Sequence, residues 1–290
     1  MKPPPFRYHR AETLDQALGV LAAEGEAAKL LAGGQSLMPL LNFRLLRPAV
    51  LVDINRVGGL AGIAEADAGL CIGAMTRHAA IAEAAPVARH FPLIVAAMAE
   101  LGHPAIRYRG TLGGSLAQAD PAAEWPLLAV LLEARILTRS PRGEGAHAAV
   151  QFFLSALTTA LAADEIITAV EFPYLPPGAG WGFAELARRH GDFALAAVAV
   201  TLARVDQRAR GVRIALLGGG DTPGRARAAE AVLEGEDLTA SSLAAAIDAL
   251  RRDATPHSDL HASAEYRREL LGVLAGRAIA AAWRRAGGGI

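Results

Sequence analysis

Two short stretches of this chain carry the strongest structural signal: AGGQSL at residues 32–37 and TLGGSL at residues 111–116. Each has two adjacent glycines followed by a serine one or two positions later, and we expect each to follow an extended stretch. Because glycine has no Cβ, the backbone N–H groups beside it can approach an anion closely. Successive N–H groups in such a turn form a concave anion site. Two such turns could hold one large ligand at two points.

A nucleotide with a pyrophosphate is a ligand of suitable size and charge for two such turns. A helix is expected to follow the first stretch, with Ser36 as its cap, and its N-terminus would add unpaired N–H donors. The hydroxyls of Ser36 and Ser115 could donate to phosphate oxygens. A single glycine pair is more often an ordinary turn, so the inference depends on the pair of stretches. The usual glycine-rich signatures of dinucleotide- and nucleoside-triphosphate-binding loops are absent from the sequence.

Strands and helices alternate along the first 176 residues, which predicts an α/β organisation. Helices are expected after the caps Thr13 and Ser36, from Thr76, over residues 91–101, and from the Asp120-Pro121 pair. We expect strands at residues 29–32, 49–54, 60–63, 69–72, 134–138 and 166–172. The strand at 49–54 is continuously apolar, as is typical of a buried parallel strand.

A segment rich in proline and glycine, residues 173–180, is the best candidate for a domain boundary. Beyond it, residues 194–204 and 211–217 are expected to form paired strands, and alanine-rich helices are expected at 223–233, 241–250 and 265–282. The chain therefore divides into an α/β part and a smaller part with a sheet packed on helices. We expect the glycine-rich end, residues 287–289, to be frayed.

Composition narrows the possible functions. Hydrophobic residues make up 52% of the 290-residue chain, which is enough for a folded core. With 29 basic and 29 acidic residues, the formal net charge of zero gives no bulk attraction to nucleic acid or anionic membranes. The one cysteine, Cys71, excludes an internal disulfide and a cysteine-ligated iron–sulfur cluster. No signal peptide or membrane-spanning run is recognisable, so a cytoplasmic location is expected.

Three longer runs carry a resemblance to a known family. AGGQSLMPLLNFRL (32–45), IRYRGTLGGSLAQADPAAEWP (106–126) and RRHGDFALAAVAV (188–200) resemble the FAD-binding medium subunits of molybdenum hydroxylases. This is the family of xanthine dehydrogenase and carbon monoxide dehydrogenase, and the TLGGSLAQAD run leans toward its quinoline-type N-heterocycle hydroxylases. The resemblance covers nearly the whole chain in order.

The resemblance implies an α+β fold. Residues 1–176 would form an FAD-binding domain of the vanillyl-alcohol-oxidase (PCMH) type, with α/β subdomains at about 1–56 and 57–176. Residues 177–290 would form a smaller C-terminal domain of the carbon monoxide dehydrogenase flavoprotein type, with an antiparallel sheet packed on helices.

The resemblance also implies a set of cofactor-binding residues. Those from the first stretch would wrap the pyrophosphate and the adjoining ribose: Leu31, Ala32, Gly33, Gly34, Gln35, Ser36 and Leu37. Those from the second would contact pyrophosphate and ribityl from the other side: Thr111, Leu112, Gly113, Gly114 and Ser115. Asp120 and Glu124 correspond to positions near the ribityl and adenosine hydroxyls. Leu101 and Ile167 match apolar positions along the ring systems, and Phe193 falls where relatives place a Tyr or Phe at the flavin.

Two residues depart from the family pattern. Ser115 stands where Asn is common, and Phe193 lacks the hydroxyl of a tyrosine, which could alter the flavin potential or access of the electron acceptor. No catalytic acid or base is carried over, and the eight histidines show no metal-binding spacing. Arg107 and Arg109 could neutralise phosphate, but we expect them to brace neighbouring loops through carboxylates instead.

By resemblance, the chain would work within a complex. Substrate would be hydroxylated at a molybdopterin cofactor on a large subunit, and electrons would pass through two [2Fe–2S] clusters on a small subunit to the FAD of this chain. An external acceptor would then take them, and the assembly would be a dimer of heterotrimers. Two alternatives stay open: a self-sufficient FAD-dependent oxidoreductase of the same fold, and a scaffold that has lost FAD. Carbon monoxide, a purine, an N-heterocycle or an aldehyde could each be the substrate.

Overall fold

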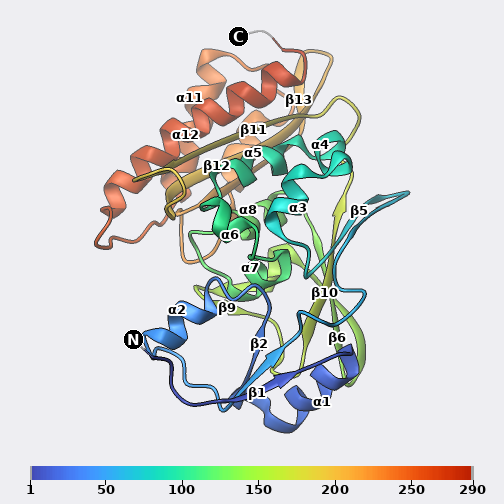
Figure 1. Ribbon diagram of the computed structural model, residues 1–290. Coiled ribbons are helices and arrows are strands. Elements are labelled where there is room, and N and C mark those ends of the chain that lie inside the picture. Colours follow the sequence, from blue (N-terminus) through green and yellow to red (C-terminus); the bar gives the residue numbers. More distant parts are fainter. Residues whose placement is uncertain (1, 289–290) are drawn as a thin grey trace.

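Strands of the computed structural model, which describes residues 2–288, form four sheets. A three-stranded sheet lies at one end of the molecule, a five-stranded sheet in the middle, and a four-stranded sheet with long helices at the other end (Figure 1). A two-stranded hairpin, β8 (Phe153–Ser155) with β9 (Thr158–Thr159), completes the set. The mixture of helices and sheets agrees with the expected α+β class.

The N-terminal sheet is parallel, in the order β1-β3-β2. Its elements are β1 (Arg7–Arg10), α1 (Leu14–Glu24), the 3-10 turn η1 (Gly25–Ala27), β2 (Ala28–Leu31), α2 (Leu37–Asn42) and β3 (Val50–Asp53). Thr13 caps α1 as predicted, because its hydroxyl accepts from the Gln16 N–H. The parallel direction brings the carboxyl ends of β2 and β3 to one edge, where loops that bind ligands commonly lie.

The middle sheet is antiparallel, in the order β4-β5-β10-β6-β7. Its strands are β4 (Ile63–Ala66), β5 (Gly69–Gly73), β6 (Arg135–Ser140), β7 (Gly143–Ala148) and β10 (Ile166–Pro173). The helices of this part are α3 (His78–Glu83), α4 (Ala85–His90), α5 (Pro92–Glu100), α6 (Pro104–Arg107), α7 (Leu112–Gln118), α8 (Glu124–Leu131) and α9 (Ala149–Phe152).

The C-terminal sheet is antiparallel, in the order β11-β12-β13-β14. Its elements are β11 (Gly180–Ala187), β12 (Ala194–Val205), β13 (Arg208–Leu217), β14 (Gly224–Arg225), α10 (Arg227–Leu233), α11 (Ala240–Asp253) and α12 (Ala264–Arg285). Helix α12 packs on β11 and β12, and α5 and α8 contact the sheet from the side of the middle part (Figure 1). The paired strands and the three helices confirm the expected layout of this region.

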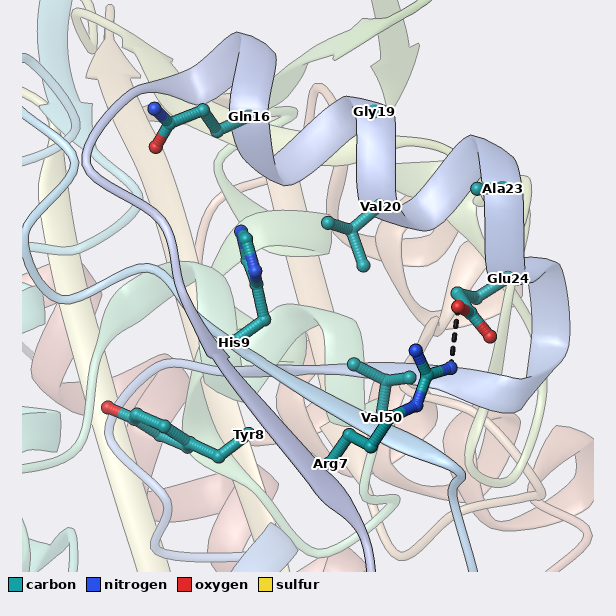
Figure 2. A pocket seen from close by; sticks show the side chains of 9 residues that line it. All are labelled: Arg7, Tyr8, His9, Gln16, Gly19, Val20, Ala23, Glu24 and Val50. Carbon is teal, nitrogen blue, oxygen red and sulfur yellow. Dashed lines mark hydrogen bonds and ion pairs between the residues drawn. The ribbon is translucent and has the colours of Figure 1, made fainter.

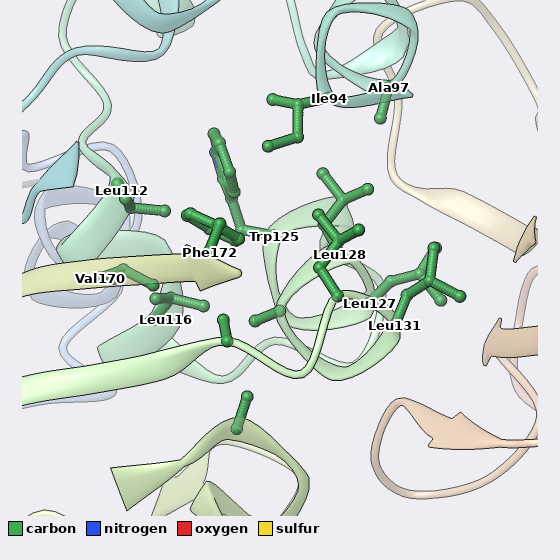
Figure 3. Packing of buried hydrophobic residues seen from close by; sticks show 14 of the residues in the cluster. Ile94, Ala97, Leu112, Leu116, Trp125, Leu127, Leu128, Leu131, Val170 and Phe172 are labelled. Carbon is green, nitrogen blue, oxygen red and sulfur yellow. The ribbon is translucent and has the colours of Figure 1, made fainter. Parts of the chain in front are cut away.

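One hydrophobic core joins the middle part to the C-terminal sheet. Figure 3 shows Trp125 and the leucines of α8 meeting Phe172 of β10 and Ile94 of α5. The same cluster includes alanines on β12 and β13, such as Ala197 and Ala215. Burying this apolar surface stabilises the fold and fixes α5 against β11 and α8 against β12 and β13.

Several expectations need correction. The residues of the expected linker from Gly180 onward form β11. A Cβ on Gly180 or Gly182 would lie 1.9 Å from a carbonyl oxygen of α12, so these glycines allow close packing between strand and helix. The helix expected from Asp120 begins at Glu124, because the Asp120 carboxylate accepts from the Ala122 N–H and forms a turn first.

Other differences are shifts of a few residues. The strand expected at 60–63 is β4, and the helix expected from Thr76 begins at His78, because the Thr76 hydroxyl bonds the Gly62 backbone instead of capping the helix. Strands β1 and β7 were not expected. Part of the expected frayed end, Gly289, lies outside the described residues. No helix within residues 2–288 is long and apolar enough to cross a membrane.

Candidate functional site

The first glycine segment, residues 32–37, links the carboxyl end of β2 to the start of α2. Within residues 2–288, no acceptor is placed for the five consecutive backbone N–H groups from Gly33 to Leu37. Gly34 has a φ of +72°, a conformation that L side chains rarely adopt. The Ser36 side chain does not cap α2, whose first N–H, that of Leu37, is the last of the five, while the next N–H, that of Met38, donates to Gly34 O at 3.1 Å. The segment is an open set of donors of the kind that binds anions.

The second glycine segment, residues 111–116, has a different structure. It follows the short helix α6 instead of an extended stretch, and Gly113 and Gly114 lie inside the first turn of α7. The Gly113 N–H donates to Ala74 O at 2.8 Å, and the Gly114 N–H donates to the Thr111 hydroxyl at 3.2 Å. The expectation of a second free backbone cradle is therefore wrong, because protein acceptors already occupy these donors.

The two segments nevertheless lie against each other. A Cβ built on Gly33 would lie 2.3 Å from the Arg109 carbonyl oxygen and 2.9 Å from the Gly110 Cα. A Cβ on Gly114 would lie 3.8 Å from the Ala32 Cβ. Any side chain at Gly33 would therefore push the segments apart. Two glycine segments that are far apart in the sequence meet at one place, as a single ligand held at two points requires.

Two residues that the sequence did not single out connect the segments. The Asn55 amide donates to Ala32 O at 2.9 Å and accepts from an Arg77 guanidinium N–H at 2.6 Å. A second N–H of Arg77 donates to the Arg109 carbonyl. Asn55 follows β3 at the same sheet edge as the first glycine segment, so the carboxyl-end rule for parallel strands was the signal that could have found it.

The remaining predicted residues occupy different environments. Leu101 and Ile167 are buried in the large core, 7% and 5% exposed, whereas Phe193 is 68% exposed. The turn before Phe193 packs on the loop after α5, since a Cβ on Gly191 would lie 2.8 Å from the His103 ring. Phe193 and Leu101 are thus held on neighbouring loops.

Carboxylates gather where α5, α8 and β11 meet. Glu124 is only 6% exposed, and burial, with Asp120 and Glu100 nearby, raises its pKa to about 7. Glu185 on β11 was not expected at all. Burial and the carboxylates of Glu124 and Glu100 raise its pKa to about 8, and its Oε2 is buried without a hydrogen-bond partner among residues 2–288. Protonated carboxyls can donate to a ligand as well as accept from it.

The two arginines before the second segment differ. Arg107 donates to the carbonyls of Leu101 and Gly102 at 3.1 and 2.8 Å, so it braces that loop through carbonyls and not through carboxylates. The Arg109 side chain is exposed. Behind the segment, the buried Trp125 indole donates to His78 at 2.9 Å, and burial together with Arg77 lowers the pKa of His78 to about 4. His78 is therefore neutral at pH 7.

A hollow elsewhere on the N-terminal part lies between β1 and α1 (Figure 2). None of the predicted site residues lines it, and its Arg7 and Glu24 side chains pair with each other at 2.6 Å. Within the described part of the chain, no group of three or more His, Cys, Asp or Glu side chains is placed to hold a metal ion.

The chemistry of the residues present fits FAD. Unpaired N–H groups and the guanidinium of Arg77 suit a pyrophosphate, and the close approach at Gly33 leaves backbone, not side chains, facing it. Hydroxyl-bearing ribose and ribityl groups suit the buried Glu124 carboxyl, and the exposed Phe193 ring suits an aromatic partner.

Comparisons with known proteins also indicate an FAD-binding chain. Residues 4–175 match the family "FAD binding domain in molybdopterin dehydrogenase", and residues 181–282 match "CO dehydrogenase flavoprotein C-terminal domain". The chain is 43% identical over 288 residues to the 6-hydroxypseudooxynicotine dehydrogenase complex subunit alpha of Paenarthrobacter nicotinovorans, covering 99% of this chain and 97% of the relative. It is 42% identical to the nicotine 6-hydroxylase medium subunit of the same organism, covering 98% and 100%.

A solved structure shares the fold over almost the full length. It is the carbon monoxide dehydrogenase of Hydrogenophaga pseudoflava in a form that lacks the Mo-pyranopterin moiety of its molybdenum cofactor. The TM-score is 0.96 at 36% identity, covering 98% of this chain and 99% of that one. By both domain matches and by these relatives, the chain belongs to the FAD-binding medium subunits of molybdenum-containing hydroxylases and dehydrogenases, and it is an oxidoreductase flavoprotein subunit.

Proposed function

We propose that FAD binds where the two glycine segments meet, with its pyrophosphate on the first segment. The observation that carries this proposal is the row of five N–H groups from Gly33 to Leu37, unpaired within the described part of the chain, beside the Gly33–Arg109 contact. Anions bind at such rows because several partial positive charges converge on one place. The second segment contributes a close packing surface and the Ser115 hydroxyl, with few free backbone donors.

The other expected contacts stay proposals. Asp120 and Glu124 would accept from ribityl or ribose hydroxyls, and Phe193 would lie at the isoalloxazine. Leu101 and Ile167 would line the apolar wall. We assign the cofactor domain, of the vanillyl-alcohol-oxidase (PCMH) type, to residues 1–176, and the C-terminal domain to residues 177–290. A cytoplasmic location stays a prediction.

The family of the chain supports a role within a complex. When bound, FAD supplies the ability to collect electrons one at a time and deliver them to an external acceptor. We propose that a small [2Fe–2S] subunit donates them and that a large molybdenum subunit hydroxylates the substrate, within a dimer of heterotrimers. Support comes from relatives named as subunits of complexes and from the single cysteine of this chain, which cannot ligate a cluster alone.

An N-heterocycle is the substrate class that we propose for the complex. The two relatives described above act on nicotine or a nicotine derivative by name. The TLGGSLAQAD run points the same way. Because the substrate site would lie on another subunit, this part of the proposal rests on the relatives and on that run, and on no substrate site in this chain.

The proposed function can be tested on the purified full chain. We expect flavin absorption in the purified protein, or after incubation with FAD, and a stoichiometry of one FAD per chain by absorption after denaturation. FMN, which lacks the adenylate and the pyrophosphate, should bind much more weakly. A chain that binds neither FAD nor FMN would contradict the proposal. Steady oxidation of a small organic donor by the chain alone would instead favour a self-sufficient oxidoreductase.

A further inference from the structure

A continuous polar bridge runs from the N-terminal sheet to the second glycine segment. The Tyr8 hydroxyl donates to Asp53 at 2.6 Å, and the other oxygen of Asp53 accepts from the Asn55 amide, also at 2.6 Å. Asn55 accepts from Arg77 at 2.6 Å, and Arg77 donates to the carbonyl of Arg109. Four elements that are separate in the sequence are joined by these contacts.

The bridge engages carbonyls on both glycine segments or directly beside them. The Asn55 amide nitrogen donates to Ala32 O at 2.9 Å and to Leu31 O at 3.3 Å. Arg77 holds the Arg109 carbonyl that lies against Gly33. Because these carbonyl oxygens accept hydrogen bonds from the bridge, they point away from a bound anion. The N–H groups from Gly33 onward then face the anion. This arrangement is preorganised, so the ligand does not have to order it.

An arginine at position 77 can hold both Asn55 and the Arg109 carbonyl better than a lysine could. Its planar guanidinium presents two N–H groups at once, one to Asn55 and one to Arg109, whereas an ammonium is a compact point charge. Burial and the neighbouring Arg109 lower the pKa of Arg77. Two arginines that repel each other beside the unpaired N–H groups make the place favourable for a bound polyanion.

We propose that Asn55 and Arg77 are positioning residues that hold the two glycine segments in the geometry that binds the FAD pyrophosphate. They act as one unit through the carbonyls of Ala32 and Arg109. This inference rests on the proposed function, because it assumes that FAD is the ligand of the first glycine segment.

The test compares FAD dissociation constants of the full chain and four variants, measured by quenching of flavin fluorescence. Asn55→Ala and Arg77→Lys should each weaken FAD binding about tenfold or more, since each breaks charge-assisted hydrogen bonds in the bridge. The double variant should bind FAD about as tightly as the weaker of the two single variants, because the effects of residues that act as a unit do not add. Arg56→Ala is the matched control: it removes a neighbouring exposed arginine outside the bridge and should leave affinity unchanged.

Two further measurements separate positioning from a general loss of stability. The melting temperature of each FAD-free variant should stay close to that of the parent chain, since Asn55 is exposed, Arg77 is half-buried, and neither belongs to a hydrophobic core. The visible circular dichroism of the bound flavin should change in Asn55→Ala and Arg77→Lys, but not in Arg56→Ala.

The outcomes distinguish this inference from the proposed function. If the parent chain binds no FAD, the proposed function fails. If the parent binds FAD and Arg77→Lys binds it equally well, only the charge at position 77 matters and the bridge is refuted. Additive losses in the double variant would equally overturn the idea that Asn55 and Arg77 act as a unit.

Discussion

Among residues 2–288, the first glycine segment leaves five backbone N–H groups without an acceptor, whereas the second donates its N–H groups to acceptors such as Ala74 and Thr111. Both have adjacent glycines followed by a serine, yet the glycines are needed for different reasons. Gly34 has a positive φ and Gly33 touches the backbone of Arg109. Gly113, in contrast, is a helical residue that packs on Ala74.

This difference teaches that a glycine pair is not by itself an anion site. The two segments differ in whether their N–H groups have protein acceptors. That depends on neighbours such as Ala74, which lie outside the glycine sequence pattern. We infer that the first segment supplies most of the affinity for the pyrophosphate, while the second supplies a wall of fixed shape.

The largest difference between the two segments is expected in FAD binding, and Gly33→Val in the first segment should show it. Its side chain would collide with the Arg109 carbonyl, since even a Cβ would lie 2.3 Å away, and FAD binding should fall by about a hundredfold or more. The dissociation constant measures this on the full chain. Because the variant could also lose stability, Gly34→Ala is the milder companion: it strains a residue with φ of +72° by about 1 kcal/mol but meets only side-chain atoms. Unchanged FAD affinity in both variants would contradict the role of the first segment.

The second-largest effect is expected for Gly113→Ala, and it should fall on stability. Its Cβ would lie 2.6 Å from the Ala74 Cβ, and such overpacking costs about 1–3 kcal/mol. Thermal melting of the FAD-free chain should show the loss, while FAD affinity at a temperature where the chain is folded should change little. A variant of full stability that has lost FAD would reverse our comparison and make the second segment the anion site.

The sequence predicted the fold class, the cap of α1 at Thr13, and the place where the first glycine segment begins. These features depend on local signals: a capping hydroxyl, apolar periodicity and a glycine pair after a strand. It did not predict the helical second segment. Thr111 can be recognised as a helix cap only from its hydrogen bond with the Gly114 N–H, which the sequence does not show. Asn55, Arg77 and Glu185 were missed because their roles come from contacts between residues far apart in the chain.

A pH dependence should arise at the carboxylates beyond the second segment. In the folded FAD-free chain, Glu124 and Glu185 have pKa values of about 7 and about 8, against the ordinary value of 4.5. The folded state therefore binds more protons than the unfolded state between these values, and the free energy of unfolding should fall as pH rises from about 4.5 through 8. We expect most of this fall to vanish in a Glu124→Gln, Glu185→Gln double variant, because a glutamine side chain does not titrate.

Denaturant unfolding at pH 5, 7 and 9 measures this dependence. The control is Glu236→Gln, which alters an exposed carboxylate far from the cluster and should leave the slope with pH unchanged. An identical pH profile in the double variant and the parent chain would show that other groups control the dependence.

The smallest effects should distinguish the hydroxyls of Ser36 and Thr111, the N-cap residues of α2 and α7. Thr111 is 2% exposed and its hydroxyl accepts from the Gly114 N–H, so Thr111→Val should cost about 1 kcal/mol, or about 2–4 °C in melting temperature. Thr111→Ser retains the hydroxyl and should recover most of this. The Ser36 side chain makes no cap hydrogen bond, so Ser36→Ala should leave the melting temperature of the FAD-free chain unchanged. It should weaken FAD binding by only a few-fold. Equal melting temperatures for Thr111→Val and Ser36→Ala would mean that the two helix starts are equivalent, and the contrast between the segments would then have to rest on the glycines alone.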